Sequence, residues 1–571
     1  MKKASRILAL LLAVMMVVGM FAGCGNQAEP EAAPPATENN QPEANQPEAN
    51  EPEAAPVEEG VLQLVWQQAS GITTIFEDPW IDLQSLYPYM IFDPLCYCDP
   101  QTSSWSPALA SDWTISEDGM TYTFTLREGV KWHDGEDFTA DDVLFTFNTQ
   151  MKNPTAKRWL LQYVEGYQAC VDGEADTLSG LSADGNTITL KLTQPDSLFL
   201  NYIGACYILP EHLLKDVDPA KLSTDEAYWS KPVGTGAYVI DEVSFPDYFT
   251  VTANENFWGE KAGIKNVQFM SYDAGGSDAV VAALIAGDLD YAYGNSVNDM
   301  AVANNIVAQN ADVVAKLKAS GYTRFFLFNM DQRTDGNNKA DLLKPEVRQA
   351  FDLLIDKNMI ASFYNGQAVA LSTFANPANP EYNDDIPLPQ KDIETAKKML
   401  EEAGFDFSQT IDMAYYYDDQ TTYDIMQMMV QDFAAAGVTL NPQLATGDLN
   451  KALYEEPNYD ILYLASGGAR ACDLYSVLLS TSPETYIGHV EERGALYDEI
   501  FKEYISTTDV ARAKELADQL QVTDYQTRYS IPAYALNTVV VFNGARVSIP
   551  DEIFEIDGCT NYRFHEWKLL G

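Results

Sequence analysis

Apolar and polar residues alternate along residues 121–126, which read TYTFTL. Tyr122, Phe124 and Leu126 fall on one side of an extended chain, and the three threonines fall on the other. A period of two is typical of a strand that buries one face. The turn signal Asp118-Gly119 comes shortly before it. We therefore predict a strand over 121–126.

A helix is predicted to begin at 139 or 140. Thr139 is a suitable N-cap, and Asp142 follows three residues later, as in a capping box. The connector before the helix, VKWHDGEDF at 130–138, is crowded with turn residues and contains His133. His133 is therefore expected in a loop, where a catalytic base, a metal ligand or a residue of the fold are all conceivable.

Other apolar runs repeat this succession of strands and helices. Strands are predicted for VLQLVW at 61–66, TITLKL at 187–192, FFLFNM at 325–330 and DILYLA at 460–465. Helical periodicity covers 346–361 and 391–403, and Gly404 ends the second helix. Strands that alternate with helices favour an α/β fold.

The first 24 residues have the layout of a secretory signal. Basic residues precede an apolar run from Ile7 to Ala22, and the small Gly23 precedes Cys24. The ending FAGC resembles the lipobox of bacterial lipoproteins, in which the cysteine carries lipid. This resemblance implies an extracytoplasmic protein held by lipid on Cys24 at the outer face of the cell membrane. The alternative is an uncleaved membrane anchor, although the run is shorter than a typical spanning helix.

Residues 25–59 form a segment of a different kind. The near-repeat QPEAN-QPEAN-EPEAA lies within it, and it contains neither Lys nor Arg. Such a composition cannot bury enough apolar surface to fold. We predict a disordered acidic tether behind a signal peptide of residues 1–24.

The charge of the chain restricts its partners. Lys and Arg total 35 against 84 Asp and Glu, which gives a formal charge of −49 over 571 residues. A surface of this kind repels phosphate backbones, so no nucleic acid is expected as a partner. The length exceeds that of a single core, so several domains are expected.

Cysteine and histidine give no sign of a metal site. Beyond Cys24 there are six cysteines, and their pairing cannot be read from the sequence. Cys96 and Cys98 form a lone C-x-C motif, which is weak evidence for zinc. We expect buried thiols or one or two disulfides, with neither a metal nor a cofactor.

A longer stretch carries a family signature. Residues 109–148 read LASDWTISEDGMTYTFTLREGVKWHDGEDFTADDVLFTFN. This stretch closely resembles the signature of the extracellular solute-binding proteins of family 5, which serve peptide- and nickel-type ABC importers. In that family the segment is structural, which implies that His133 is a hydrogen-bonded loop residue rather than a base.

Further segments resemble the family in the same order along the chain. PVGTGAY at 232–238 resembles its P-x-G-T-G-P-Y turn, with Ala237 in place of proline, and we expect Gly236 to supply a positive φ. The other matching segments are NENFWG at 254–259, ALIAGDLD at 283–290, PEVRQA at 345–350 and AKKMLEEAG at 396–404. The resemblance covers roughly Val61 to Gly571.

The resemblance implies a two-lobed periplasmic-binding-protein-like fold, type II, of the large peptide-binder subclass, with an inserted third domain. We place lobe I at 60–85, 232–322 and 530–571, the inserted domain at 86–231 and lobe II at 323–529. Hinge closure of the lobes on a ligand would then be the functional motion.

The resemblance also directs attention to a loop after the strand at 460–465. In peptide-binding relatives a carboxylate near this point holds the amino terminus of the peptide. Here Arg470 falls near that position and Asp473 lies three residues later. Arg470 would favour a carboxylate or phosphate ligand, whereas Asp473 would serve as the amine partner if the alignment gap falls differently. A surface role for Arg470 is the alternative.

Other candidates follow the ends of predicted strands. Tyr415 and Tyr417 could stack on a flat or sugar-like ligand, although core packing explains at least one side of such a pattern. Gln67, Ser70 and Gly71 follow the first strand. We expect these residues to line the binding site.

We expect a receptor rather than an enzyme. The chain lacks the G-x-S-x-G, P-loop and H-E-x-x-H motifs, and none of its four histidines lies beside a plausible nucleophile. The expected function is capture of a short peptide and its delivery to an ABC permease, by a monomer. The alternatives are an anionic organic solute, an oligosaccharide or a nickel chelate, and more remotely a secreted hydrolase.

Overall fold

The structure is a computed structural model of the protein. The structure describes residues 60–66, 86–99, 104–154, 156–197, 199–244, 247–272, 276–293, 297, 299–320, 322–467, 472–482, 487–507, 509–554 and 562–570. Cys24, the signal segment and the acidic tether lie outside these residues, as do Gln67, Ser70, Gly71 and Arg470.

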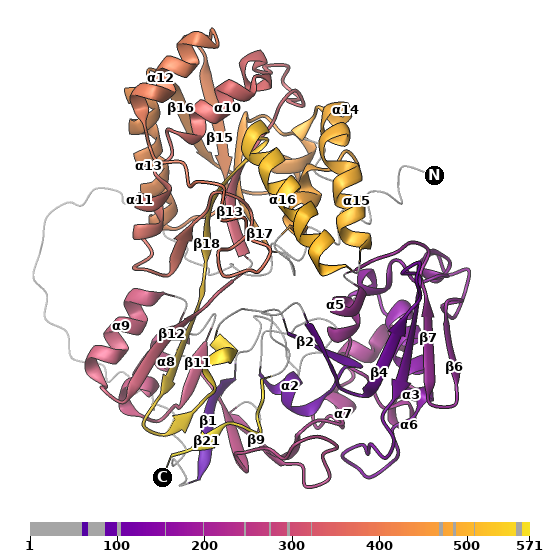
Figure 1. The fold of residues 1–571 in the computed structure, drawn as a ribbon. Coiled ribbons are helices and arrows are strands. Elements are labelled where there is room, and N and C mark those ends of the chain that lie inside the picture. Colours follow the sequence, from indigo (N-terminus) through magenta and orange to yellow (C-terminus); the bar gives the residue numbers. More distant parts are fainter. Residues whose placement is uncertain are drawn as a thin grey trace, which may run out of the picture. The chain divides into compact units, whose positions relative to one another are not determined.

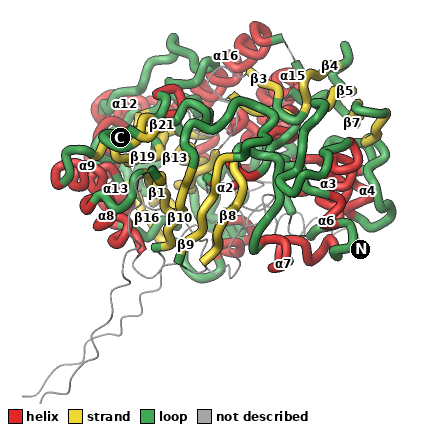
Figure 2. The backbone as a smooth tube through the Cα atoms, turned by 90° about the horizontal axis from the view of Figure 1, so that it is seen from below, coloured by secondary structure: helices red, strands yellow, loops and turns green. Residues whose placement is uncertain are grey.

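A seven-stranded mixed sheet contains both early and late parts of the chain. β1 runs parallel to β10, with Val61 opposite Asn266, and β19 runs antiparallel to both β11 and β12. Figure 2 shows β1, β10 and β8 within this sheet. In order across the sheet the strands are β12 (Val313–Lys318), β19 (Thr538–Asn543), β11 (Tyr291–Tyr293), β1 (Val61–Trp66), β10 (Asn266–Ser271), β9 (Tyr248–Ala253) and β8 (Tyr238–Ser244).

Two helices complete the core at one end of this sheet. α8 (Gly276–Ala286) and α9 (Met300–Gln309) share an apolar cluster with β12 and β19. Asp299 caps α9 by accepting a hydrogen bond from the backbone N–H of Ala301. Beyond the sheet, β20 (Val547–Ser548) pairs with β21 (Lys568–Leu569).

A six-stranded sheet forms the core of the second half of the chain. In order its strands are β14 (Ala368–Ala370), β18 (Ser530–Leu536), β13 (Tyr322–Phe328), β17 (Ile461–Gly467), β15 (Thr410–Tyr415) and β16 (Thr439–Leu444). The accompanying helices (Figure 1) are α10 (Pro345–Asp352), α11 (Lys357–Ser362), α12 (Ile393–Glu402), α13 (Gln420–Ala435), α14 (Val490–Arg493), α15 (Glu499–Ser506) and α16 (Val510–Thr527).

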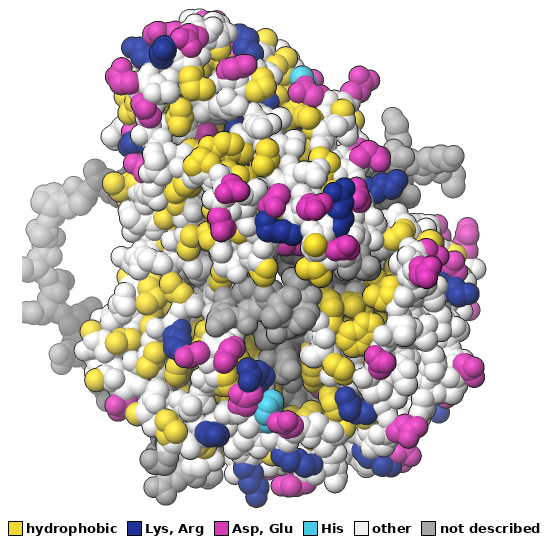
Figure 3. Space-filling view, viewed as in Figure 1, with side chains coloured by type: hydrophobic (Ala, Val, Ile, Leu, Met, Phe, Trp, Pro, Cys, Tyr) yellow, Lys and Arg dark blue, Asp and Glu magenta, His cyan; other side chains and the backbone are white. Residues whose placement is uncertain are grey.

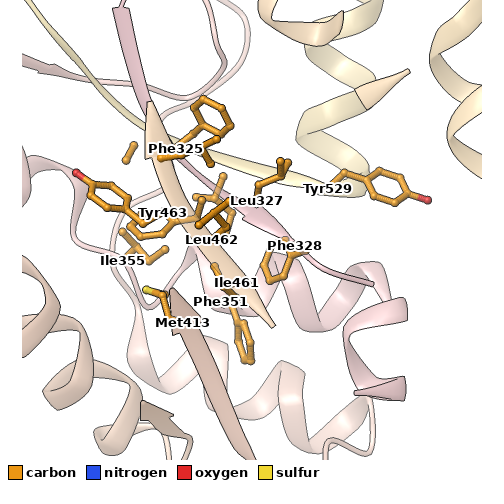
Figure 4. Close-up of a cluster of buried hydrophobic side chains, with 14 of the residues drawn as sticks. Phe325, Leu327, Phe328, Phe351, Ile355, Met413, Ile461, Leu462, Tyr463 and Tyr529 are labelled. Carbon is orange, nitrogen blue, oxygen red and sulfur yellow. The ribbon is translucent and has the colours of Figure 1, made fainter. Parts of the chain in front are cut away.

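The core of this sheet is almost entirely apolar and aromatic. Phe328 of β13, Phe351 of α10 and Met413 of β15 belong to one cluster with Ile461 of β17 (Figure 4). The central strands β13, β17 and β18 are buried on both faces over most of their length, which explains why their sequences read as nearly continuous apolar runs.

A separate four-stranded antiparallel sheet lies between the first two segments of the seven-stranded sheet in sequence. Its order is β4 (Ala110–Ile115), β5 (Thr121–Leu126), β7 (Thr187–Lys191) and β6 (Leu181–Asp184). The prediction of a strand over 121–126 is confirmed, with Tyr122, Phe124 and Leu126 buried. Helices in this part of the chain are α2 (Tyr87–Ile91), α3 (Ala140–Lys152), α4 (Tyr167–Val171), α5 (Phe199–Gly204), α6 (Glu211–Leu214) and α7 (Glu226–Trp229), and a further hairpin joins β2 (Cys96–Asp99) to β3 (Ser104–Pro107).

The predicted start of the helix after residue 138 is confirmed. Thr139 caps α3, and its backbone N–H donates to Oδ2 of Asp142 at 2.8 Å. The two residues thus form the expected capping box.

One predicted helix is divided into two. The helical pattern at 346–361 corresponds to α10 and α11, which are separated by residues 353–356. Asp356 accepts a hydrogen bond from the backbone N–H of Met359 and so caps a new helix instead of continuing the first. Buried Asp352, at the end of α10, binds Lys357 at 2.9 Å, which holds the two helices together across the break.

The chain crosses between the two large sheets twice. Residues 319–321 join β12 to β13, and Asn537 joins β18 to β19. The two crossings touch, because Oδ1 of Asn537 accepts the backbone N–H of Ser320 at 3.2 Å. β18 pairs with β13, so the second crossing lies after residue 536, within the stretch 530–571 that the sequence assigned to lobe I.

His133 lies in a loop and serves the fold. Its backbone N–H donates to the carbonyl of Gly234 at 2.9 Å, and its Nδ1 accepts the N–H of Gly234 at 3.2 Å. Its Nε2 lies 3.1 Å from the carbonyl of Gly236, which suits a neutral ring that donates there. Burial lowers the pKa of His133 to about 4, which favours the same neutral form.

The expected role of Gly236 is wrong. Its φ is not positive. Glycine is needed instead because this turn passes close to another segment: a Cβ at Gly236 would lie 2.4 Å from the carbonyl oxygen of Met90. A Cβ at Gly234 would meet the carbonyl oxygen of Ile91 at 1.8 Å.

The described residues bear on the state of the cysteines and on membrane-spanning helices. Cys96, Cys170, Cys206 and Cys472 are buried. Among the helices of the described residues, none combines the length and the apolar character needed to cross a bilayer. Acidic and basic side chains are interspersed over the face shown in Figure 3.

Candidate functional site

The described candidate residues gather mainly at one edge of the six-stranded sheet. β15 runs parallel to both β16 and β17, so the carboxyl ends of these three strands meet there. In open α/β sheets, ligands bind outside the carboxyl ends of the strands. Tyr415 is the last residue of β15 and pairs with Tyr463 of β17.

Tyr415 and Tyr417 have different surroundings. Tyr415 is buried in the apolar core, so its ring is part of the fold. Tyr417 is only partly buried, and its hydroxyl lies 2.8 Å from that of Tyr416. The rings of Tyr416 and Tyr417 have centroids 4.3 Å apart. Tyr417 is therefore the better placed of the two to contact a ligand.

Arg324 lies among these tyrosines and was not predicted from the sequence as a site residue. Its position in β13 places it beside Ala465 of β17 on one side and Tyr534 of β18 on the other. The guanidinium carbon lies 3.5 Å from the centroid of the Tyr417 ring.

Two guanidinium nitrogens of Arg324 have no hydrogen-bond partner among the described residues. Nε and Nη1 are buried and bond to nothing, while the residue as a whole is only partly buried. Burial acts to lower the pKa of Arg324, and the surrounding tyrosines, Tyr463 first, raise it overall. The side chain therefore stays a cation.

The tyrosine hydroxyls around Arg324 form two short networks. Tyr534 joins the hydroxyls of Tyr364 and Tyr463, each at 2.6 Å. The second network is the pair of Tyr416 and Tyr417. Burial raises the pKa of all five tyrosines, so their hydroxyls remain protonated donors.

Asp473 lies apart from these contacts, at the start of a 3-10 helix over Asp473–Leu478. Its charge acts on Tyr202 of α5, whose pKa is raised mainly by burial and further by Asp196 and Asp473. Near this place the backbone N–H of Ser197 donates to the carbonyl of Ile505. Asp473 thus faces the part of the chain that was assigned to the inserted domain.

The opposite end of the same strands contains a complete ion-pair network. Arg333 lies 3.0 Å from Asp412 of β15, 2.9 Å from Asp460 before β17 and 2.8 Å from Asp335. Burial raises the pKa of Asp460, while hydrogen bonds from the Asp412 N–H and Arg333 act to lower it. These groups satisfy one another.

Within the described part of the chain, no group of three or more His, Cys, Asp or Glu side chains is placed to hold a metal ion. The described residues at the carboxyl ends of β15 and β17 contribute aromatic rings, hydroxyls and one guanidinium to the candidate site. Such a surface can stack on flat groups and donate hydrogen bonds to acceptors.

Comparisons with known proteins agree with this architecture. Residues 104–487, more than half of the chain, match the model of bacterial extracellular solute-binding proteins, family 5. A putative ABC transporter peptide-binding protein of Brucella ovis is 28% identical over 382 residues, which span 64% of this chain and 65% of that protein. Heme-binding protein A of Haemophilus influenzae is 27% identical over 442 residues, 75% of this chain and 78% of that protein.

A solved structure shows the same fold. The ABC transporter substrate binding protein CtaP of Listeria monocytogenes superposes with a TM-score of 0.69 at 21% identity. The superposition covers 90% of this chain and 99% of that one. The chain belongs to the bacterial extracellular solute-binding proteins of family 5, as its sequence signature indicated.

Proposed function

We propose that this protein is the extracytoplasmic receptor of an ABC importer, which captures a short peptide and delivers it to the permease. The family match over residues 104–487 carries the proposal. The described site supports it, because partly buried tyrosines and a guanidinium meet at the carboxyl ends of parallel strands.

Hinge closure would take place around the two crossings. Ser320 and Asn537 lie side by side, so a rotation of one large sheet relative to the other would require few changes of backbone torsion. In this proposal the seven-stranded sheet forms lobe I and the six-stranded sheet forms lobe II. The segment 86–231 is the inserted domain, and the receptor works as a monomer.

We propose that lipid on Cys24 holds the receptor at the outer face of the membrane, with residues 25–59 as the tether. Replacing Cys24 by Ser should release the protein from washed membranes into the soluble fraction. Retention of the C24S variant on the membrane would show that another feature anchors it.

The ligand class is tested by native mass spectrometry of the full chain, purified in mild detergent from cells without added ligand. A ladder of retained masses that fragment as short peptides is expected. A single non-peptide mass, such as a porphyrin or a metal chelate, would overturn the peptide part of the proposal and leave the receptor role. Cleavage of added peptides on incubation would overturn the receptor role.

A further inference from the structure

The cluster of Arg324 with Tyr364, Tyr416, Tyr417, Tyr463 and Tyr534, here called the Arg324 cluster, has an excess of hydrogen-bond donors. Its three linked hydroxyls on Tyr364, Tyr463 and Tyr534 share two hydrogen bonds, so one hydroxyl hydrogen is left over. The hydroxyl pair of Tyr416 and Tyr417 likewise leaves one. The buried Nε and Nη1 of Arg324 add further donors that lack acceptors among the described residues.

By contrast, three buried arginines in the same half of the chain have carboxylate or carbonyl acceptors. Arg528 binds Asp352 at 2.8 Å. Arg348 donates to the carbonyls of Leu342 and Thr527 at 2.6 and 2.9 Å, and Arg493 donates to those of Gly488 and Leu479 at 2.6 and 2.9 Å. Burying guanidinium nitrogens without acceptors is costly, so their occurrence at Arg324, the one arginine of the described residues where this is seen, calls for a functional reason.

Nearby carboxylates do not serve as acceptors for the guanidinium of Arg324. Among the described residues, none forms an ion pair with Arg324 within 4.0 Å, although the chain has 84 acidic residues. Asp419, whose charge acts on Tyr364 and Tyr463, accepts hydrogen bonds from the backbone N–H and hydroxyl of Thr422 at the start of α13. The Asp419 carboxylate therefore caps α13.

We propose that the Arg324 cluster binds a carboxylate group of the transported ligand. Tyr417 stacks on one face of the guanidinium, so a carboxylate would approach the edge of the group, where Nε and Nη1 lie buried without acceptors. Protonated tyrosine hydroxyls at the same place donate to the same oxygens.

The position of the Arg324 cluster would couple the binding of a carboxylate to the two crossings between the large sheets. Arg324 lies near the start of β13, directly after the first crossing, and Tyr534 lies near the end of β18, directly before the second. A carboxylate bound here therefore contacts both strands that lead into the crossings. This inference rests on the proposed receptor function and names the chemical group that the receptor recognises.

The test compares short peptides that have a free carboxyl terminus with the same peptides amidated at that terminus. Calorimetric titrations use the full chain and its variants R324M and R324K, with R512M as the matched control. Arg512 undergoes the same change of charge, but it lies at the surface and binds Glu503 and Glu515. The wild type should bind the free acids about 10- to 100-fold more tightly than the amides.

In the R324M variant this preference should disappear, with the affinity for amides unchanged, and R324K should recover part of it. R512M should behave as the wild type does. An R324M variant that keeps the full preference for acids would overturn the inference and leave the receptor function intact.

A wild type that binds neither form would instead contradict peptide capture. The ligand that the full chain retains from cells then decides the inference, as measured by native mass spectrometry. An acid that is retained by the wild type and lost from R324M supports it. A neutral or cationic ligand, or equal retention by both proteins, overturns it.

Stability without ligand separates binding from a merely structural role. Removal of an unsatisfied guanidinium should leave the ligand-free Tm of R324M equal to or above that of the wild type. A Tm lower by about 5 °C or more would show that the arginine supports the fold, and would overturn the inference.

Discussion

The two ends of β15 and β17 present the same charged group in opposite states. At the amino ends, Arg333 is surrounded by Asp335, Asp412 and Asp460 at 2.8 to 3.0 Å. At the carboxyl ends, Arg324 is surrounded by tyrosines, and two of its nitrogens have no acceptor in the described part of the chain. Both arginines come from the segment that begins with β13.

The difference distinguishes scaffold from site. A complete ion-pair network fixes one end of the strands, because removal of one member leaves a buried charge unpaired. An incomplete network at the other end costs stability and is retained where a ligand completes it. The comparison predicts that mutations at the two arginines have opposite consequences for folding and binding.

The largest expected effect is that of R333M on stability. The variant leaves Asp460, which is fully buried, without its counter-charge, so the free energy of unfolding should fall by about 3–5 kcal/mol. Urea unfolding followed by circular dichroism measures the change. Surface substitution R512M should cost less than about 1 kcal/mol in the same assay. If the free energy of unfolding of R333M falls by less than about 1 kcal/mol, the amino ends of β15 and β17 are not distinguished from the carboxyl ends by a stabilising network.

His133 provides a second satisfied group, with a pH dependence of known sign. Its folded pKa of about 4 lies below the ordinary value of 6.5, so the unfolded state binds more protons between these values. The stabilisation is complete above pH 6.5 and is lost as the pH falls toward 4, by at most about 3 kcal/mol.

Urea unfolding of the wild type and of H133Q at pH 7 and pH 4.5 tests this point. The wild type should lose about 2 kcal/mol more than the variant over that range, because all other groups titrate equally in both proteins. Parallel pH profiles would show that the hydrogen bonds of His133 to the 234–236 turn do not depend on its neutral form.

A smaller effect is expected from the stacked pair within the Arg324 cluster. A double-mutant cycle between R324M and Y417L should give a coupling free energy of about 0.5–2 kcal/mol in the ligand-free protein. The unfolding free energies of the four proteins provide this value. Additive single effects would mean that the 3.5 Å contact contributes nothing, and that Tyr417 does not hold the guanidinium in place.

Sequence patterns correctly predicted those elements of the fold that are determined by residues close together in the sequence. The strands at 61–66 and 121–126 have the predicted bounds, and the capping box of Thr139 and Asp142 is present. The helix pattern at 346–361 failed at its centre, because Asp356 caps a new helix; the Asp352–Lys357 ion pair spans the break. An apolar period cannot show such a break.

The candidate site was predicted only in part, for a physical reason. Tyr415 and Tyr417 were visible as residues at a strand end. Arg324, Tyr463 and Tyr534 come from β13, β17 and β18, which only sheet pairing brings together. Tyr364 follows α11 and joins them through the hydroxyl of Tyr534. The one local signal was an arginine within the aromatic strand YTRFFLF, where no charge is expected.

The most direct test of this account is a crystal structure of the protein with the ligand that it retains from cells. The account predicts a ligand carboxylate whose oxygens lie about 2.7–2.9 Å from the guanidinium nitrogens of Arg324, with the Tyr417 ring still stacked on its face. A bound ligand that leaves these nitrogens without an acceptor, or that presents a positive group to them, would contradict it.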